Sequence, residues 1–267
     1  MTASSSVVKL TAKTALKNHW LKTSVACILV LFAYFIVSVT SGFVSFVLND
    51  YAAYVFLGLC AIFLLFPLIL GLIKFFWRFI FGADDSPVSV FSYFSGKAEY
   101  KRALRLTVSL ALRAAGFGLL LFFPAILVDL FSGVKVYDFL NIPIPLWTSN
   151  FGYLSVFLKT LAGVALFFIM LKYYLAPFLI VADENMEVGE AIHMSSIVSK
   201  NVMLDIIYLF LSFLGWIALS VLIVPLVFTM PYMLTSLSFH VRFAIAEYNK
   251  RVEKINQSDI PTFAAGI

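Results

Sequence analysis

The amino-acid sequence predicts an all-α, polytopic membrane protein with six transmembrane helices and amphipathic cytoplasmic helices. Hydrophobic residues make up 62% of the 267 residues and charged residues 12%, and the mean hydropathy is +1.00. Soluble domains contain about 45–50% apolar and about 25% charged residues. Several apolar runs also reach about 20 residues, the length that crosses a bilayer as a helix. We therefore expect one membrane domain, residues 1–267.

Six spans account for the apolar runs, at about 24–48, 52–73, 106–128, 153–181, 204–224 and 225–246. The first run follows several lysines, as the apolar part of a signal peptide does. It is 25 residues long, whereas that part of a signal peptide has about 7–15, so an uncleaved helix is the better interpretation. The last region is the hardest, because the 34 residues from Ile206 to Phe239 carry no formal charge. They are too many for one crossing and few for two.

The distribution of cations predicts that both termini are cytoplasmic. Loops on the cytoplasmic side of a membrane are enriched in lysine and arginine. The opposite side would carry three aspartates, Asp50, Asp129 and Asp138, and one loop cation, Lys135. The segments assigned to the cytoplasm carry Lys9, Lys13, Lys17, Lys22, Lys74, Arg78, Lys97, Lys101, Arg102, Arg105, Lys250, Arg251 and Lys254. We expect a multi-pass protein of a bacterial cytoplasmic membrane.

A faint threefold repeat is the next expectation, with units at 6–81, 86–181 and 189–247. Each unit would be a surface helix followed by a helical hairpin. The surface segments 6–20, 86–100 and 189–203 align with lysines in register, and the second helix of each hairpin contains one proline, at Pro67, Pro177 or Pro231. Repeats of this kind are common in membrane folds. The alternative is that amphipathic segments and prolines recur by coincidence.

Lys172 is the leading candidate for a functional residue. It is flanked by uncharged runs of twelve and ten residues, and a lysine at the bilayer centre costs about 2.5–3.5 kcal/mol. We expect Lys172, Arg113 and Lys159 to line a cavity for an anionic group, with hydroxyl donors from Tyr173 and Tyr174. The alternative is that these cations reach the membrane surface with their long side chains.

The sequence offers no catalytic, metal or cofactor motif, so we expect neither an enzyme nor a bound cofactor. Cys27 and Cys60 lie singly in apolar runs, and the three histidines are scattered. The net charge of +5 comes from helix-flanking cations. It does not indicate nucleic-acid binding, because these cations do not form a stripe interleaved with aromatic residues.

The last hundred residues resemble a bacterial family of integral membrane proteins, domain-of-unknown-function family 975. The resemblance rests on "YYLAPFLIVADEN" (173–185), "GEAIHMSS" (189–196), "LSFLGW" (211–216) and "MPYM" (230–233). The family is distantly similar to the membrane domain of some glycerophosphodiester phosphodiesterases. This resemblance implies a six-helix membrane fold and lipid-related work, and it supplies no catalytic residues.

Three functions follow as hypotheses. The first is binding or handling of an anionic membrane lipid or amphiphile, without catalysis. The second is a scaffold for a cytoplasmic protein partner or transporter component, docked by the basic segment 97–105 and the acidic turn 183–190. The third is solute transport, which internal repeats and interrupted helices suit. The oligomeric state is not predicted.

Overall fold

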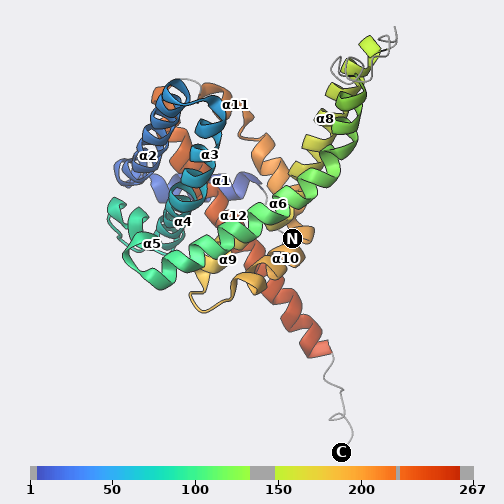
Figure 1. Cartoon of the computed structure of the whole chain (residues 1–267). Coiled ribbons are helices and arrows are strands. Elements are labelled where there is room, and N and C mark those ends of the chain that lie inside the picture. Colours follow the sequence, from blue (N-terminus) through green and yellow to red (C-terminus); the bar gives the residue numbers. More distant parts are fainter. Residues whose placement is uncertain (1–4, 133–147, 221–222, 259–267) are drawn as a thin grey trace, which may run out of the picture. The chain divides into compact units, whose positions relative to one another are not determined.

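The computed structural model describes residues 5–132, 148–220 and 223–258, and these ranges are helical without any β-strand (Figure 1). Five helical segments in them are long and apolar enough to cross a membrane: Trp20–Val47, Asp50–Ile80, Lys97–Leu130, Gly152–Ala182 and Val188–Leu211. The predicted all-α class with several membrane-length apolar helices is thus confirmed, and the number of six spans stays a prediction. The chain forms two compact units, one comprising 1–107 and 174–267 and the other 108–173.

The first unit contains a helical hairpin made of the first two candidate spans. Helix α2 (Trp20–Val47) is followed by α3 (Asp50–Cys60), a π-helical turn η1 (Ala61–Leu65) and α4 (Phe66–Ile80). Asn49 begins α3, because its side-chain oxygen accepts the Ala52 N–H at 2.8 Å. Pro67 follows the π turn directly. A proline has no N–H and its ring clashes with the preceding turn, which explains a widened turn at this point.

Three short helices accompany this hairpin in the first unit. They are α1 (Ser5–Leu16), η2 (Pro87–Phe91) and α5 (Ser92–Ser95). Helix α1 is the predicted amphipathic helix, and it buries Val8, Ala12 and Leu16, which share one face at four-residue spacing. Helix η2 lies against α4 at Gly71, where a Cβ atom would be 1.8 Å from the Val90 carbonyl oxygen. Only a glycine permits that approach.

The C-terminal part of the first unit differs from the predicted layout. It consists of α9 (Ala176–Ala182), α10 (Val188–Leu211), α11 (Leu214–Leu219) and α12 (Ile223–Ser258). The predicted surface helix 189–203 and the start of the predicted span 204–224 form one helix, α10. No glycine or proline interrupts the chain between 190 and 211, so nothing local ends a helix there. The predicted sixth span, 225–246, falls in α12, which is not among the five candidates.

The buried core of the first unit consists of two apolar clusters. One joins α2 to α4 and η2, and its buried members are Ala26, Cys27, Val30, Leu68, Leu72, Phe75, Phe76 and Val90. The other joins α1, α4, α10 and α12 through Val8, Ala12, Ile80, Ile206, Leu209, Phe213 and Phe239. Helix α12 packs against α1, α2 and α4 (Figure 1). The far halves of α2 and α3 remain outside both clusters, with large apolar side chains exposed as lipid-facing helices have them.

The second unit consists of the part of α6 (Lys97–Ser132) from Val108 onward, α8 (Thr148–Met170) and the 3-10 turn η3 (Leu171–Tyr173). The predicted third span, 106–128, lies inside α6, which begins nine residues earlier. The predicted fourth span, 153–181, is interrupted, because α8 ends at Met170 and α9 begins at Ala176. Pro177 explains the restart, since the residue before a proline is disfavoured in a helix and proline fits a first turn. Lys135 and Asp138 lie outside the described residues, and the threefold repeat stays a prediction.

Candidate functional site

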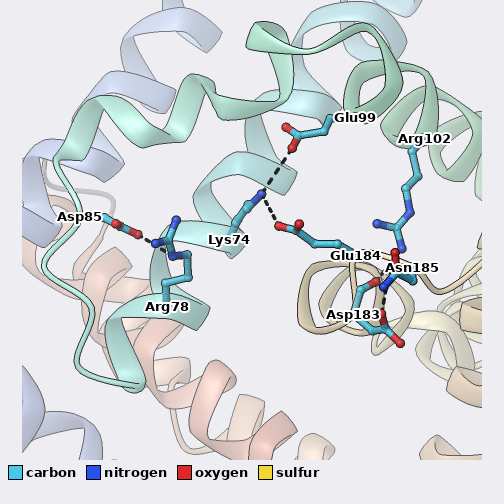
Figure 2. Close-up of polar contacts among 8 residues, drawn as sticks. All are labelled: Lys74, Arg78, Asp85, Glu99, Arg102, Asp183, Glu184 and Asn185. Atoms are coloured by element: carbon cyan, nitrogen blue, oxygen red, sulfur yellow. Dashed lines mark hydrogen bonds and ion pairs between the residues drawn. The ribbon is translucent and has the colours of Figure 1, made fainter.

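Lys74 is the centre of a polar site in the first unit, formed where α4, the start of α6 and the turn after α9 meet (Figure 2). Its ammonium nitrogen is 3.0 Å from Glu184 Oε1 and 3.9 Å from Glu99 Oε1. The same nitrogen lies 5.7 Å from the centre of the Tyr93 ring. The Lys74 side chain is 15% exposed, whereas that of Glu184 is 70% exposed. Lys74 is therefore a mostly buried cation, and the Glu184 carboxylate that it binds faces the solvent.

Arg102 fixes the turn between α9 and α10. Its guanidinium donates to the carbonyl oxygens of Asp183 and Met186, at 2.6 and 2.5 Å. Within the turn, the Asp183 carboxylate accepts the Asn185 N–H at 2.8 Å (Figure 2). The predicted basic segment and acidic turn therefore contact each other inside one unit. Charge-assisted bonds of this kind are stronger than neutral ones and hold a turn in one geometry.

The electrostatics of the site follow from these contacts. Lys74 lowers the pKa of Glu184, first through the hydrogen bond it donates and then through its charge. Burial raises the pKa of Tyr93 to about 12. At neutral pH Glu184 is thus an anion paired with Lys74, and Tyr93 is a neutral phenol beneath the lysine.

A cavity of about 620 Å³ opens beside the turn. Three cations from α6 line one side of it, and the start of α10 lines another. We call it the basic pocket, and its lining residues are Ala98, Lys101, Arg102, Arg105, Glu184, Asn185, Met186, Glu187, Val188 and Gly189. Lys101 and Arg105 are one helical turn apart and exposed, and neither bonds to another side chain in the described part of the protein. Glu187 precedes α10 without capping it through its side chain. The first N–H groups of a helix have no partner within the helix.

A second cavity of about 240 Å³ adjoins the basic pocket. The two share Ala98, Arg102, Glu184 and Asn185 in their linings, and the second adds Lys74 and Tyr93. It is also lined by apolar side chains of α9, Ile180 and Val181. An anion in these cavities would meet cations and N–H donors on one side and an apolar wall beside them.

Further ion pairs hold the end of α4. Arg78 Nε lies 3.0 Å from Asp85 Oδ2 (Figure 2), and Lys22 at the start of α2 pairs with Asp84. The pair with Lys22 lowers the pKa of Asp84. These contacts place the start of α2 and the end of α4 at the same end of the hairpin, as an antiparallel pair requires.

The structure places the sequence-predicted site residues in three different settings. In the second unit, Lys159 pairs with Asp129, its nitrogen 2.7 Å from Asp129 Oδ2, and Ser155 donates to the same carboxylate. The prediction that Lys159 faces an anionic ligand did not foresee this partner, because Asp129 was assigned to a loop. It lies in α6, which extends to Ser132.

Arg113 and Tyr173, both predicted site residues, lie together in the second unit. The Arg113 guanidinium carbon is 5.9 Å from the centre of the Tyr173 ring, and the same side chain donates to the Ser109 carbonyl at 3.1 Å. Lys172 is half-buried in η3, the 3-10 turn inside the candidate span Gly152–Ala182. Tyr174 belongs to the first unit, where its hydroxyl lies 3.4 Å from His240 Nδ1. That Lys172, Arg113, Lys159, Tyr173 and Tyr174 line one cavity stays a prediction.

Sequence reasoning missed the pairing of Lys74 with Glu184, which are 110 positions apart. Lys74 was counted only as a cytoplasmic cation, and the acidic turn only as a helix start. The one visible signal for the basic pocket was the pair Lys101 and Arg105, spaced four residues apart before an apolar run. Charge spacing of this kind predicts a shared helix face but not what lies opposite it.

Comparison with known proteins identifies one matching family and no matching individual protein. The family model described as "Protein of unknown function (DUF975)" matches residues 1–243. No curated protein and no solved structure matches the chain. The match covers most of the 267 residues and includes α1, α4, the basic pocket and most of α12, so the resemblance seen in the last hundred residues extends over residues 1–243. The chain belongs to family DUF975, whose function is unknown.

Proposed function

We propose that this protein binds the phosphate-bearing headgroup of an anionic lipid or amphiphile in the basic pocket, without catalysing a reaction. The observation that carries the proposal is the position of Lys101, Arg102 and Arg105 on one wall of a 620 Å³ cavity. Arginine and lysine donate several hydrogen bonds to phosphate oxygens, and arginine does so in a forked geometry. The start of α10 on the adjacent wall adds unpaired N–H groups and the positive end of a helix dipole.

The charges of the pocket favour one added anion. Glu184 also lines the cavity, but Lys74 neutralises it. Arg102 is turned toward the carbonyls of Asp183 and Met186. Lys101 and Arg105 are opposed only by Glu187 among the remaining charged lining residues. A phosphate placed between these two cations would balance the excess charge.

The position of the pocket along α6 supports a lipid as the source of the phosphate. The apolar run of α6 starts at Leu106, directly after Arg105, so the three cations end an otherwise apolar span. Headgroups lie at this level of a bilayer, and the anionic lipids of the cytoplasmic leaflet attract basic residues there. A bacterial cytoplasmic membrane with both termini inside, and the lipid-related work implied by the resemblance to phosphodiesterase membrane domains, belong to the same proposal.

The test is native mass spectrometry of the gently purified full chain, with bound lipids extracted and identified. The double variant Lys101→Gln/Arg105→Gln should lose at least several-fold of a bound anionic phospholipid that the wild type retains. Lys97→Gln is the matched control, because it removes a charge from the same helix outside the pocket lining. Lys172→Gln tests the site that the sequence suggested and should keep its lipid.

Two outcomes would overturn the proposal. Equal lipid content in wild type and double variant would remove the basic pocket as a headgroup site. Loss of lipid in Lys172→Gln alone would return the site to the second unit. Binding of added inorganic phosphate distinguishes a lipid headgroup from free phosphate as the ligand. A site for free phosphate retains no lipid, and it binds phosphate equally well in the wild type and in Lys97→Gln.

The scaffold hypothesis loses part of its basis in the structure. The basic segment and the acidic turn were expected to dock a partner, but Arg102 contacts the turn directly and Lys74 bridges Glu184 and Glu99. Arg102, Glu99 and Glu184 thus have partners within the chain, and docking of a cytoplasmic protein by the other charges of these segments stays a prediction. Solute transport stays a prediction from the sequence alone.

A further inference from the structure

Helix α10 is 24 residues long and rises about 36 Å, enough to cross a bilayer. Both its ends, however, are linked to the last two turns of α4, one through an ion pair and the other through a shared apolar cluster. The turn before its first residue is joined to Lys74 through Glu184. Near its other end, Ile206 and Leu209 share a buried cluster with Ile80. Lys74 and Ile80 are only six residues apart on α4, about 9 Å along the helix. Helix α10 therefore runs across the end of α4.

The exposed side chains of α10 agree with this orientation. Lys200 and Asn201, in the middle of the helix, are both exposed, as are Glu190 and His193 before them. A lysine facing lipid at the centre of a crossing helix costs about 2.5–3.5 kcal/mol. From Leu204 onward the exposed side chains become apolar, including Tyr208 and Leu211. The helix thus has a polar face over its first two-thirds and an apolar face at its end.

Helices α11 and α12 form a hairpin that starts and ends at the same buried cluster. Phe213, just before α11, lies in one buried cluster with Phe239 of α12. Its ring and that of Trp216 both contact the ring of Tyr232, with centres 5.4 and 6.0 Å apart. Helix α11 has six residues and rises about 9 Å, far less than the roughly 30 Å of a hydrocarbon core.

Contacts with α2 limit how deep this hairpin reaches. The Ser24 hydroxyl, one turn into α2, donates to the Val227 carbonyl at 3.1 Å, and Trp20 at the start of α2 contacts Phe228. Helix α12 begins at Ile223, one turn before Val227. Its start therefore lies within about 15 Å of the level where α2 begins, whereas α2 extends about 42 Å. Most of α2 continues beyond the hairpin.

We propose that α10 and the α11–α12 hairpin do not cross the membrane but form a platform seated in one leaflet, on the side of the basic pocket. The polar face of α10 contacts water, and the acyl chains of that leaflet cover the exposed apolar side chains of the hairpin. These are Leu214, Trp216, Ile217 and Phe228, between 43% and 56% exposed. The surface is continuous with the lipid-facing start of α2, where Leu21 and Val25 are exposed. Irregular and re-entrant segments are stable in a membrane where protein covers their backbone.

This arrangement accounts for the 34 uncharged residues from Ile206 to Phe239. The segment is short for two crossings because, in this arrangement, it does not cross the membrane. Lys9 of α1 completes the platform, since its ammonium donates to the Ser212 carbonyl at 2.9 Å and lies 4.5 Å from the centre of the Phe213 ring. A cation at a helix C-terminus stabilises the last carbonyls and the dipole.

Single cysteines introduced into full-length protein lacking Cys27 and Cys60 test the platform, with a membrane-impermeant maleimide applied to intact and permeabilised cells. Gly189→Cys marks the side of the basic pocket, and Asn49→Cys, at the turn between α2 and α3, marks the other side. We expect Asn201→Cys to be labelled from the same side as Gly189→Cys. An unlabelled Asn201→Cys, or labelling from the side of Asn49→Cys, would mean that α10 crosses the membrane.

The depth of the hairpin is measured separately, so that the result does not depend on labelling alone. A fluorophore on Ile217→Cys in vesicles should be quenched more by lipids brominated near the glycerol backbone than by lipids brominated near the methyl end. Stronger quenching from the methyl end would place the hairpin at the bilayer centre and overturn the platform. Both measurements are independent of whether the basic pocket binds a headgroup.

Discussion

Lys74 and Glu184 lie 110 positions apart in the chain, yet the ammonium of one is 3.0 Å from the carboxylate of the other. This pair joins α4 to the turn before α10. It therefore sets the position of the basic pocket, because Glu184 lines that pocket and Lys74 lines its neighbour.

The stability of the protein should depend on this pair in mildly acidic solution. The pKa of Glu184 is lowered in the folded state, so the pair stabilises fully above the ordinary glutamate pKa of about 4.3 and is lost as pH falls through the lowered value. Because Glu184 is 70% exposed, we expect only about 0.2–1 kcal/mol. Thermal unfolding of wild type and Glu184→Gln should differ at pH 7 and converge toward pH 3. Lys74→Gln should remove the same pH dependence, and parallel curves for wild type and Glu184→Gln would contradict the pairing.

Arg102 should matter for local order more than for overall helix content. Replacing Arg102 with glutamine removes two charge-assisted hydrogen bonds to the turn carbonyls. Hydrogen bonds to charged groups contribute about 1.5–3 kcal/mol each when they are well formed. Limited proteolysis should cleave Arg102→Gln within 183–187 at least several-fold faster than Lys97→Gln. Equal cleavage rates would show that Arg102 does not hold the turn.

Gly71 should be intolerant of any side chain. A Cβ atom there would lie 1.8 Å from the Val90 carbonyl oxygen, and the obstacle is backbone, which cannot rotate away. Overpacking typically costs about 1–3 kcal/mol, and a backbone clash reaches the upper end of that range. Gly71→Ala should therefore lower the thermal midpoint. Gly58→Ala is the matched control, because its Cβ meets no atom within 4 Å and alanine favours a helix by about 0.5–1 kcal/mol over glycine. A Gly71→Ala variant as stable as Gly58→Ala would show that η2 does not pack on α4.

Lys159 and Asp129 should act as a pair in the second unit. Their charged atoms are 2.7 Å apart. A double-mutant cycle of Lys159→Met and Asp129→Asn should therefore show coupling, with the double variant less destabilised than the sum of the single variants. Thermal unfolding in one detergent measures all four proteins. Additive effects of the two substitutions would mean that Lys159 and Asp129 do not interact. Lys159 could then face a ligand, as the sequence suggested.

Much of the fold was predictable because the bilayer restricts what a chain can do. The apolar runs that became α2, α3 with α4, and α6 were visible in composition alone, since a spanning segment must satisfy its own backbone hydrogen bonds. These features depend on neighbouring residues, and sequence reports such features well. Pro177 was read only as a proline tolerated inside the span 153–181, whereas α9 restarts beside it, at Ala176.

Contacts between distant segments were not predictable in the same way. The depth of the region from Ile206 to Phe239 depends on where Phe213 and Phe239 pack, not on its hydropathy. The partner of Lys159 depended on how far α6 extends past residue 128. The basic pocket required Arg102 to meet a turn more than 80 residues away. Apolar length predicts that a segment avoids water, and only packing decides where it lies.

The cluster that joins Val8 and Ala12 to Phe239 also has a consequence for biosynthesis. Helix α1 leaves the ribosome before α2, but Phe239, which helps to bury it, is made more than 220 residues later. Lipid or a chaperone must therefore cover the apolar face of α1 while the hairpin of α2 to α4 inserts. Contacts of such long sequence separation form late and slowly. Helix α1 is then among the last of these elements to reach its native environment, although it precedes the others in the chain.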